Sequence, residues 1–177
     1  MRTYSDILSL MYKQLPVFQK IGSRAYKPGF NRIKKLLTLL KNPEKNFKSI
    51  HIAGTNGKGS TAHLISSILQ ESGYKVGLFT SPHLIDFRER IKINGKYISK
   101  SEVKEFIIKN LEFLIDNKIT FFEMTVAMAF SHFSKEKVDI ALIEVGMGGR
   151  LDATNIIIPD LSIITNISLE HTEFLGE

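Results

Sequence analysis

Cysteine is absent from the 177-residue sequence, and this absence excludes several kinds of chemistry. The chain can form no disulfide framework, no thiolate metal site and no cysteine nucleophile. The cysteine content leaves open which redox compartment the protein occupies.

Long apolar runs are also missing. No stretch approaches the roughly 20 apolar residues that a membrane-spanning helix needs. The N-terminal segment MRTYSDILSLMYKQLP lacks the uninterrupted apolar core of a secretory signal. The sequence also contains no internal repeat, low-complexity tract or convincing linker. We therefore expect a soluble cytoplasmic protein that has no membrane partner.

The charge balance is basic, with a formal net charge of +6. This charge suits acidic partners such as nucleotides, polycarboxylates, nucleic acid or anionic membranes. The lysines are scattered, however, and the longest basic cluster, Lys34, Lys35 and Lys41, is typical of a solvated helix face. Charge alone therefore gives little support to nucleic-acid binding. With 43% hydrophobic and 24% charged residues, the chain has enough of both to fold as about one domain with a real core.

Apolar spacing predicts an alternation of helices and strands. Helices are expected over residues 3–15, 30–41 and 121–134. A further helix is expected between a glycine-rich loop (residues 54–59) and Gly73, with apolar residues Ala62, Ile65, Ile68 and Leu69. Another is expected after a capping box of Ser99 and Glu102, with apolar residues Val103, Phe106, Ile107, Leu111 and Leu114. Strands are expected over residues 47–53, 74–80, 138–145 and 161–167, with a hairpin over residues 90–99 that turns at Asn94–Gly95. Continuous apolar strands between helices predict an α/β fold, with a mostly parallel sheet covered by helices on both faces.

The segment IHIAGTNGKGSTAHLISSILQESG, residues 50–73, places three glycines and a lysine at a strand-to-helix junction. A phosphate chain can lie against backbone N–H groups only where no Cβ atom obstructs it. The first turn of a helix adds unpaired donors and a favourable dipole. Gly54, Gly57 and Gly59 permit that approach, and Lys58 can reach the outer phosphates as a point charge. The segment therefore predicts a phosphate-binding loop.

The loop departs from the pattern G-x-x-x-x-G-K-[ST] in two places. Ile52 stands where the first glycine is expected, and Gly59 separates the lysine from the hydroxyl residues Ser60 and Thr61. A glycine-rich turn with an exposed lysine is the alternative. The strand before the loop and the helix after it favour phosphate binding, in which Ser60 or Thr61 offers a hydroxyl to phosphate or Mg²⁺.

Two further polar segments follow apolar strands. Glu144 ends one strand ahead of three glycines and Asp152, and Asn166 and His171 follow the last strand. Ligands of parallel sheets bind at the carboxyl ends of the strands. We therefore expect Glu144 and His171 to face the same crevice as the phosphate loop, where a carboxylate can hold Mg²⁺. The alternative is structural: Glu144 begins a surface loop, Asp152 caps a turn, and a lone histidine packs.

With these residues in view, the chain resembles the folylpolyglutamate synthase and dihydrofolate synthase family, a branch of the Mur ligase superfamily. HIAGTNGKGS resembles the phosphate loop of that family, and TSPHLIDFRERIKING resembles its segment after the second strand. LIEVGMGGRLDATNII resembles its second signature, and ITNISLEHTEFLG its histidine motif. PGFNRIKKLL, from Pro28, is similar to the helix that the family carries ahead of the loop. The resemblance covers nearly the whole chain.

The resemblance implies an ATP-dependent ligase. In the family, a carboxylate of dihydropteroate or of a folate glutamate tail attacks the γ-phosphate of ATP, and L-glutamate captures the resulting acyl phosphate. ATP and Mg²⁺ are the implied cofactors, and a monomer is expected. The implied ATP-binding residues are Gly54, Thr55, Asn56, Gly57, Lys58, Gly59, Ser60 and Thr61. The implied metal ligands are Ser81, Glu144 and His171, and the implied catalytic residues are Lys58, Glu144 and His171.

Substrate binding is implied for the segment after the second strand and for one later residue. The candidates are Ser81, Pro82, His83, Arg90 and Glu123, with His83 and Phe87 as packing partners for the pterin. His51, His63 and His132 match no motif of the family and are expected to be structural. Glu170 stands where the family usually has aspartate, which leaves the role of this carboxylate open.

The family continues beyond these motifs to a carbamylated lysine, adenine contacts and a C-terminal domain that helps to bind glutamate. We therefore expect residues 1–177 to be the N-terminal ATPase portion, which binds ATP or ADP but does not complete ligation alone. Two other functions stay open: a nucleotide-binding module without ligase activity, and another Mur-type ligase such as a cell-wall enzyme. The sequence GKGS favours the folate branch, because the cell-wall enzymes place the hydroxyl residue directly after lysine.

Overall fold

A computed structural model describes residues 3–15 and 29–176; Pro28, where the resemblance begins, lies outside this part. Six strands form a single sheet in the order β4-β3-β2-β5-β1-β6. Their bounds are β1 Lys48–Ala53, β2 Val76–Phe79, β3 Ile91–Ile93, β4 Lys96–Tyr97, β5 Ile140–Glu144 and β6 Leu161–Ile164. Strands β2, β5, β1 and β6 are parallel, and β3 and β4 add an antiparallel edge. The expected mostly parallel sheet is confirmed.

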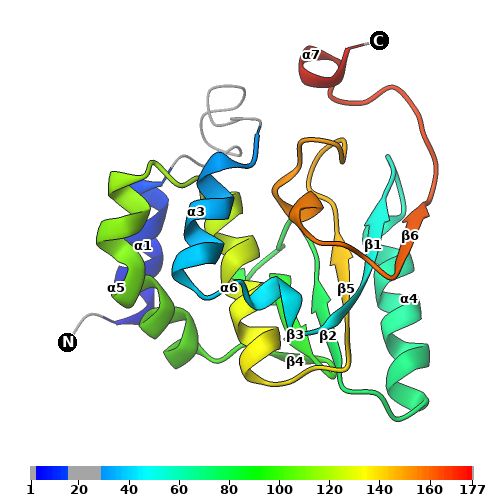
Figure 1. Cartoon of the computed structure of the whole chain (residues 1–177), viewed down its shortest axis with the longest axis horizontal. Helices are drawn as coiled ribbons and strands as arrows, with labels where there is room; N and C mark the ends of the chain where they lie inside the picture. The colour runs from blue at the N-terminus through cyan, green and yellow to red at the C-terminus, as the bar shows by residue number, and fades with distance from the viewer. Residues whose placement is uncertain (1–2, 16–28, 177) are drawn as a thin grey trace.

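Helices cover both faces of this sheet (Figure 1). Their bounds are α1 Tyr4–Gln14, α3 Asn31–Leu39, α4 Lys58–Glu71, α5 Lys100–Asp116, α6 Phe121–Lys135 and α7 Thr172–Leu175. Short 3-10 helices are η2 Pro43–Lys45, η3 Phe87–Arg90 and η4 Ala153–Ile156. Helix α4 packs on one face against β1, β2 and β5, and α6 packs on the other face, where α1, α3 and α5 add a second layer. Within the described residues, no helix has the length and apolarity needed to cross a membrane.

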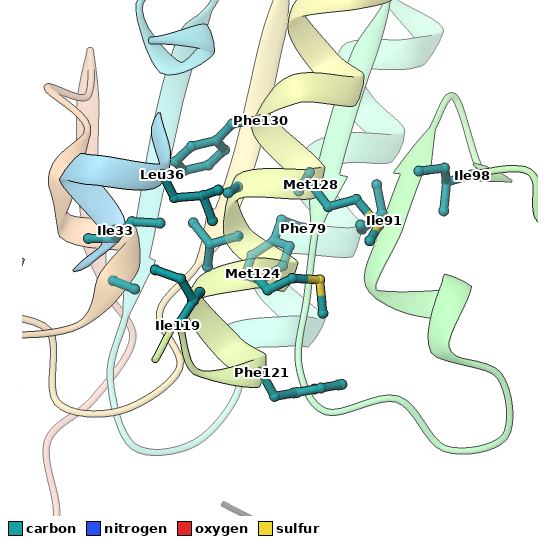
Figure 2. Close-up of a cluster of buried hydrophobic side chains, with 14 of the residues drawn as sticks. Ile33, Leu36, Phe79, Ile91, Ile98, Ile119, Phe121, Met124, Met128 and Phe130 are labelled. Atoms are coloured by element: carbon teal, nitrogen blue, oxygen red, sulfur yellow. The ribbon is translucent and has the colours of Figure 1, made fainter. Parts of the chain in front are cut away.

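The core is unequal on the two faces. The larger cluster lies between the sheet and α6, and Figure 2 shows Phe79 and Met124 at its centre, with Phe130 beside Leu36. The smaller cluster lies under α4 and contains Ile52 and Leu142. Because α6 is buried over most of its length, this helix is the hydrophobic centre of the fold.

The expected elements are confirmed, with shorter strands than the apolar runs suggest. Asn94 and Gly95 have φ angles of 45° and 73° in the β3–β4 hairpin, as a type I′ turn requires. Ser99 and Glu102 form the predicted capping box of α5. The apolar spacing predicts helix α4 correctly, although one of its apolar residues, Ile68, is 65% exposed. Ala62, Ser66 and Leu69 define the face of α4 that meets the sheet, and Ile68 lies about a third of a turn beyond it.

Candidate functional site

The phosphate loop leaves β1 and enters α4 through two glycines in the left-handed region. Gly54 has a φ of +130° and Gly57 a φ of +81°, and Gly57 is the N-cap residue of α4. A Cβ atom at Gly57 would meet no other atom within 4 Å. The backbone at Gly57 is therefore open to a ligand, and the N–H groups of a first helical turn suit an anion.

Lys58 curls back over this loop. Its ammonium nitrogen donates to the carbonyl oxygens of Gly54 at 2.8 Å and Thr55 at 3.0 Å. These contacts hold the cation at the centre of the loop, at the positive end of the helix dipole. A cation and a helix N-terminus together favour a multiply charged anion such as a phosphate chain.

The end of β6 fixes the other side of the phosphate loop. The Thr55 N–H donates to the Asn166 carbonyl oxygen, and the Asn56 N–H donates to Asn166 Oδ1, both at 2.9 Å. The Thr165 hydroxyl donates to the Asn56 carbonyl oxygen at 2.7 Å. Asn166, which follows the last strand, is therefore in contact with the phosphate loop.

Glu144 lies beside the start of α4, as the parallel sheet predicts. A Cβ atom built on Gly59 would lie 3.5 Å from Glu144 Oε2, and the Ser81 N–H donates to Oε2 at 2.9 Å. Glu144 is buried, with 4% of the residue exposed. Burial raises the pKa of Glu144, while the hydrogen bond from Ser81 and the charges of Lys58 and Arg90 act against that rise. Glu144 is thus a buried carboxylate between two cations.

Loop 80–90 brings Ser81 and Arg90 to the same strand ends. It begins at a cis Ser81–Pro82 peptide, and its turn is fixed by Glu89, whose carboxylate accepts the N–H groups of Leu84, Ile85 and Asp86. Pro82 is exposed. Since Leu84 and Ile85 are 89% and 94% exposed, the loop presents two apolar side chains to solvent beside the site.

Arg90 is the most deeply buried cation of this loop, at 4% exposure. Its Nε donates to His83 Nδ1 at 2.7 Å, and His83 Nε2 lies 3.2 Å from the Tyr12 hydroxyl. Burial lowers the pKa of Arg90 to about 10. Burial and the charge of Arg90 also lower the pKa of His83, which keeps this imidazole neutral.

Aromatic side chains surround this arginine. The Arg90 guanidinium lies 5.3 Å from the ring centroid of Phe121, and Tyr12 stacks on the same ring with centroids 5.3 Å apart. Phe87 meets Phe121 edge to face. Tyr12 and Phe121 are site residues that sequence reasoning missed. Their positions look like ordinary apolar positions of amphipathic helices, so no local signal marked them.

Asp152 holds the glycine-rich turn that follows β5. Its carboxylate accepts the N–H groups of Gly146 at 3.1 Å, Met147 at 2.9 Å and Thr154 at 2.9 Å, and the Thr154 hydroxyl at 2.5 Å. His51 Nε2 lies 2.8 Å from that hydroxyl, and burial lowers the pKa of His51 to about 4. Asp152 thus caps a turn, one of the alternatives raised by the sequence, and His51 is structural as expected.

Two candidate site residues, Glu123 and His171, contact residues other than Glu144 and those of the phosphate loop. Glu123 caps α6 by accepting the Thr120 N–H, and its Oε2 pairs with Arg32 at 3.1 Å. His171 is exposed at the N-cap of α7, with its Nε2 at 3.6 Å from Glu170 Oε1. The described part of the chain contains no group of three or more acidic or histidine side chains arranged around a metal position. Substrate binding by Glu123 and metal binding by His171 stay predictions.

Comparison with known proteins identifies the family. The model of the Mur ligase middle domain matches residues 52–177. The dihydrofolate synthase/folylpolyglutamate synthase of Bacillus subtilis is 45% identical over 180 residues, which cover 98% of this chain and 40% of that protein. The crystal structure of folylpolyglutamate synthase from Thermotoga maritima superposes with a TM-score of 0.84 at 42% identity, over 96% of this chain and 39% of that one. The structure of E. coli FolC in complex with DHPP and ADP superposes with a TM-score of 0.87 at 32% identity, over 100% of this chain and 42% of that one.

The chain therefore belongs to the Mur ligase family. Its relatives place it in the branch of the folylpolyglutamate and dihydrofolate synthases, which confirms the resemblance seen in the motifs. The chain spans about two fifths of the length of these relatives.

Proposed function

We propose that this chain supplies the ATP-binding part of a ligase that joins L-glutamate to dihydropteroate or to the glutamate tail of a reduced folate. The observation that carries the proposal is the glycine loop at the start of α4, with Lys58 inside it and Glu144 beside it. A solved relative that superposes over the whole chain is a complex with DHPP and ADP, and another is an FPGS-AMPPCP-folate complex. These complexes support a nucleotide and a folate as ligands of the whole enzyme.

The phosphates of ATP would lie along the loop from Gly54 to Thr61. The open backbone at Gly57 and the first N–H groups of α4 receive the phosphate oxygens, and Lys58 turns from the loop carbonyls toward the outer phosphates. Ser60 and Thr61 stand in the first turn of α4, where a hydroxyl can reach phosphate or a phosphate-bound cation. Thr55 and Asn56 keep the loop in place through Asn166.

The residues around Glu144 fit a magnesium ion by their donor chemistry. The Glu144 carboxylate and the Ser81 hydroxyl are hard oxygen ligands on neighbouring strand ends, joined by the hydrogen bond from the Ser81 N–H to Glu144 Oε2. Mg²⁺ commonly takes one or two protein oxygens and completes its shell with phosphate and water. When bound, the ion would neutralise charge that develops on the transferred phosphoryl group. By family resemblance, His171 is the proposed ligand of a second metal.

In the proposed reaction, an oxygen of the substrate carboxylate bonds to the γ-phosphorus as the bond to ADP breaks. The amine of L-glutamate then bonds to the acyl carbon, phosphate leaves and the amine loses a proton. Lys58 and Arg90 flank the reacting anions and stabilise the charge on them. Ser81, Pro82 and His83 line the substrate side, and Glu123 is a candidate for the same side.

Isothermal titration of this chain with Mg-ATP tests the phosphate site. Removing the charge-assisted contacts of Lys58 by Lys58→Ala should weaken binding by about 10- to 100-fold. Lys45→Ala is the matched control, because Lys45 is exposed in η2 at the opposite end of β1, and its affinity should equal that of the unaltered chain. Equal affinities for the unaltered chain and Lys58→Ala, or no binding by the unaltered chain, would contradict the proposal.

A further inference from the structure

Within the described residues, the buried Arg90 guanidinium forms no direct ion pair with a carboxylate. In that part of the chain, its side chain makes one hydrogen bond, from Nε to His83 Nδ1. Its two terminal nitrogens are therefore left for a ligand. The charges of Glu144 and Glu89 favour the cation, but neither carboxylate pairs with it directly. A buried cation without a direct partner is costly, and an anion bound to these nitrogens would offset that cost.

His83 links this guanidinium to the N-terminal helix. Because Nδ1 accepts the Arg90 Nε–H, the hydrogen of the neutral ring is on Nε2. Nε2 lies 3.2 Å from the Tyr12 oxygen, which accepts this hydrogen. The order of donors is therefore fixed from Arg90 through His83 to Tyr12, and the imidazole can take only one orientation.

Tyr12 is itself held firmly. Its ring stacks on Phe121 at an interplanar angle of 21°. Near the other end of α1, the Tyr4 hydroxyl donates to Asp86 Oδ1 at 3.1 Å. Helix α1 is therefore anchored on loop 80–90 at two points, and the phenol of Tyr12 is a fixed end for the relay.

We propose that Tyr12 and His83 are positioning residues that hold the terminal nitrogens of Arg90 for the carboxylate of an aromatic acid. The inference rests on the proposed function and names the residues that position one of its substrates. The anion is the carboxylate of an aromatic acid rather than a phosphate because Arg90 packs against the aromatic ring of Phe121. Lys58 in the glycine loop and the N-terminus of α4 serve the phosphates instead.

The test is titration of the full 177-residue chain with pteroate in the presence of Mg-ATP, using variants that break the relay at chosen atoms. His83→Ala removes the acceptor of Arg90 and should weaken pteroate binding about tenfold. In His83→Asn, the amide oxygen stands where Nδ1 stood, so affinity should return to within about threefold of the unaltered chain. Tyr12→Phe keeps the stacking on Phe121 but removes the hydroxyl that accepts the hydrogen of His83. Pteroate affinity should fall by about three- to tenfold.

Two controls separate positioning from folding. His63→Ala alters an exposed histidine of α4 and should leave pteroate affinity unchanged. Pteroate methyl ester has no carboxylate, so it should bind the unaltered chain about tenfold more weakly, and the relay variants should not weaken it further. The Mg-ATP affinity should be the same in all of these variants.

The outcomes are distinct from those of the phosphate-site test. Equal pteroate affinity in His83→Ala and the unaltered chain, no rescue by His83→Asn, or no effect of Tyr12→Phe would overturn the relay while Mg-ATP binding stands. Absence of pteroate binding by a chain that binds Mg-ATP would also overturn it. A parallel loss of Mg-ATP affinity in His83→Ala would show a structural role instead.

Discussion

The loops after β1 and β2 both bring cations to Glu144, but they are held in different ways. The loop after β1 is fixed by backbone geometry, through Gly54 and Gly57 and through hydrogen bonds from its own N–H groups to Asn166. The loop after β2 is tied to α1 by the Tyr4 and Tyr12 hydroxyls. The first depends on glycine geometry and on contacts with Thr165 and Asn166 at the end of β6. The second depends on tyrosine side chains of α1 that lie more than 70 positions away. Each should therefore fail under a different kind of substitution.

Gly54→Ala should give the largest effect and should break the β1 loop alone. A Cβ atom at Gly54 would lie 2.1 Å from Thr165 Oγ1 and 2.9 Å from the Asn166 carbonyl oxygen, at a φ of +130°. Relief requires the end of β6 to move, so we expect a loss of about 2–4 kcal/mol in the free energy of unfolding. Mg-ATP binding should fall below detection, while loop 80–90 keeps its contacts.

Gly73→Ala is the matched control for Gly54→Ala. Gly73 also has a positive φ, +89°, but its Cβ would meet no atom within 4 Å. The strain at this position alone should cost about 1 kcal/mol, with unchanged Mg-ATP affinity. Urea unfolding and titration of both variants give the comparison, and equal losses in the two would show that contact with β6 is unimportant.

Acidification should weaken the two regions in separate pH ranges. The pKa of His51 on β1 is lowered from 6.5 to about 4. Between these values the unfolded chain binds a proton that the folded chain does not, so stability falls as the pH falls. At pH 5 the loss from His51 relative to pH 8 should be about 2 kcal/mol. On the β2 side, the hydrogen bond from Arg88 lowers the pKa of Asp86 from 3.8 to about 2, so its contribution is lost only below pH 3.8.

His51→Gln isolates the first of these contributions. The glutamine amide can donate to Thr154 as His51 Nε2 does, but it does not titrate. Urea unfolding at pH 8 and pH 5 should show a smaller decrease in stability for the variant, by about 2 kcal/mol. An identical decrease in both proteins would mean that another group, such as His132, whose pKa burial also lowers, causes the pH dependence.

Tyr4→Phe should give the smallest effect and should loosen only the β2 loop. The substitution removes the hydrogen bond to Asp86, which is partly buried, so we expect a loss of about 1 kcal/mol in unfolding free energy. Tyr74→Phe, at a tyrosine that is 50% exposed, is the control and should be neutral. Thermal unfolding of the two variants measures the difference, and a loss for Tyr74→Phe of the same size would remove the proposed anchor.

Much of the fold follows from local patterns in the sequence. The capping box of α5 and the Asn94–Gly95 turn each depend on a few neighbouring residues, so both could be predicted. The apolar runs placed β1, β2, β5 and β6, although β2, β5 and β6 each end earlier than their apolar runs. The apolar spacing predicted helix α4 but not which face is buried, because only contact with the sheet decides that Ala62 is buried and Ile68 exposed.

The sequence by itself determined the phosphate loop and the approach of Glu144 to it. Glycine geometry is a property of single residues, and parallel strands end at one edge of a sheet. Only the tertiary structure decided that Tyr12 and Phe121 surround Arg90, and that Asp152 and His51 hold the turn after β5. These contacts join side chains that are far apart along the chain. Their formation depends on helix packing against the sheet, which no short segment encodes.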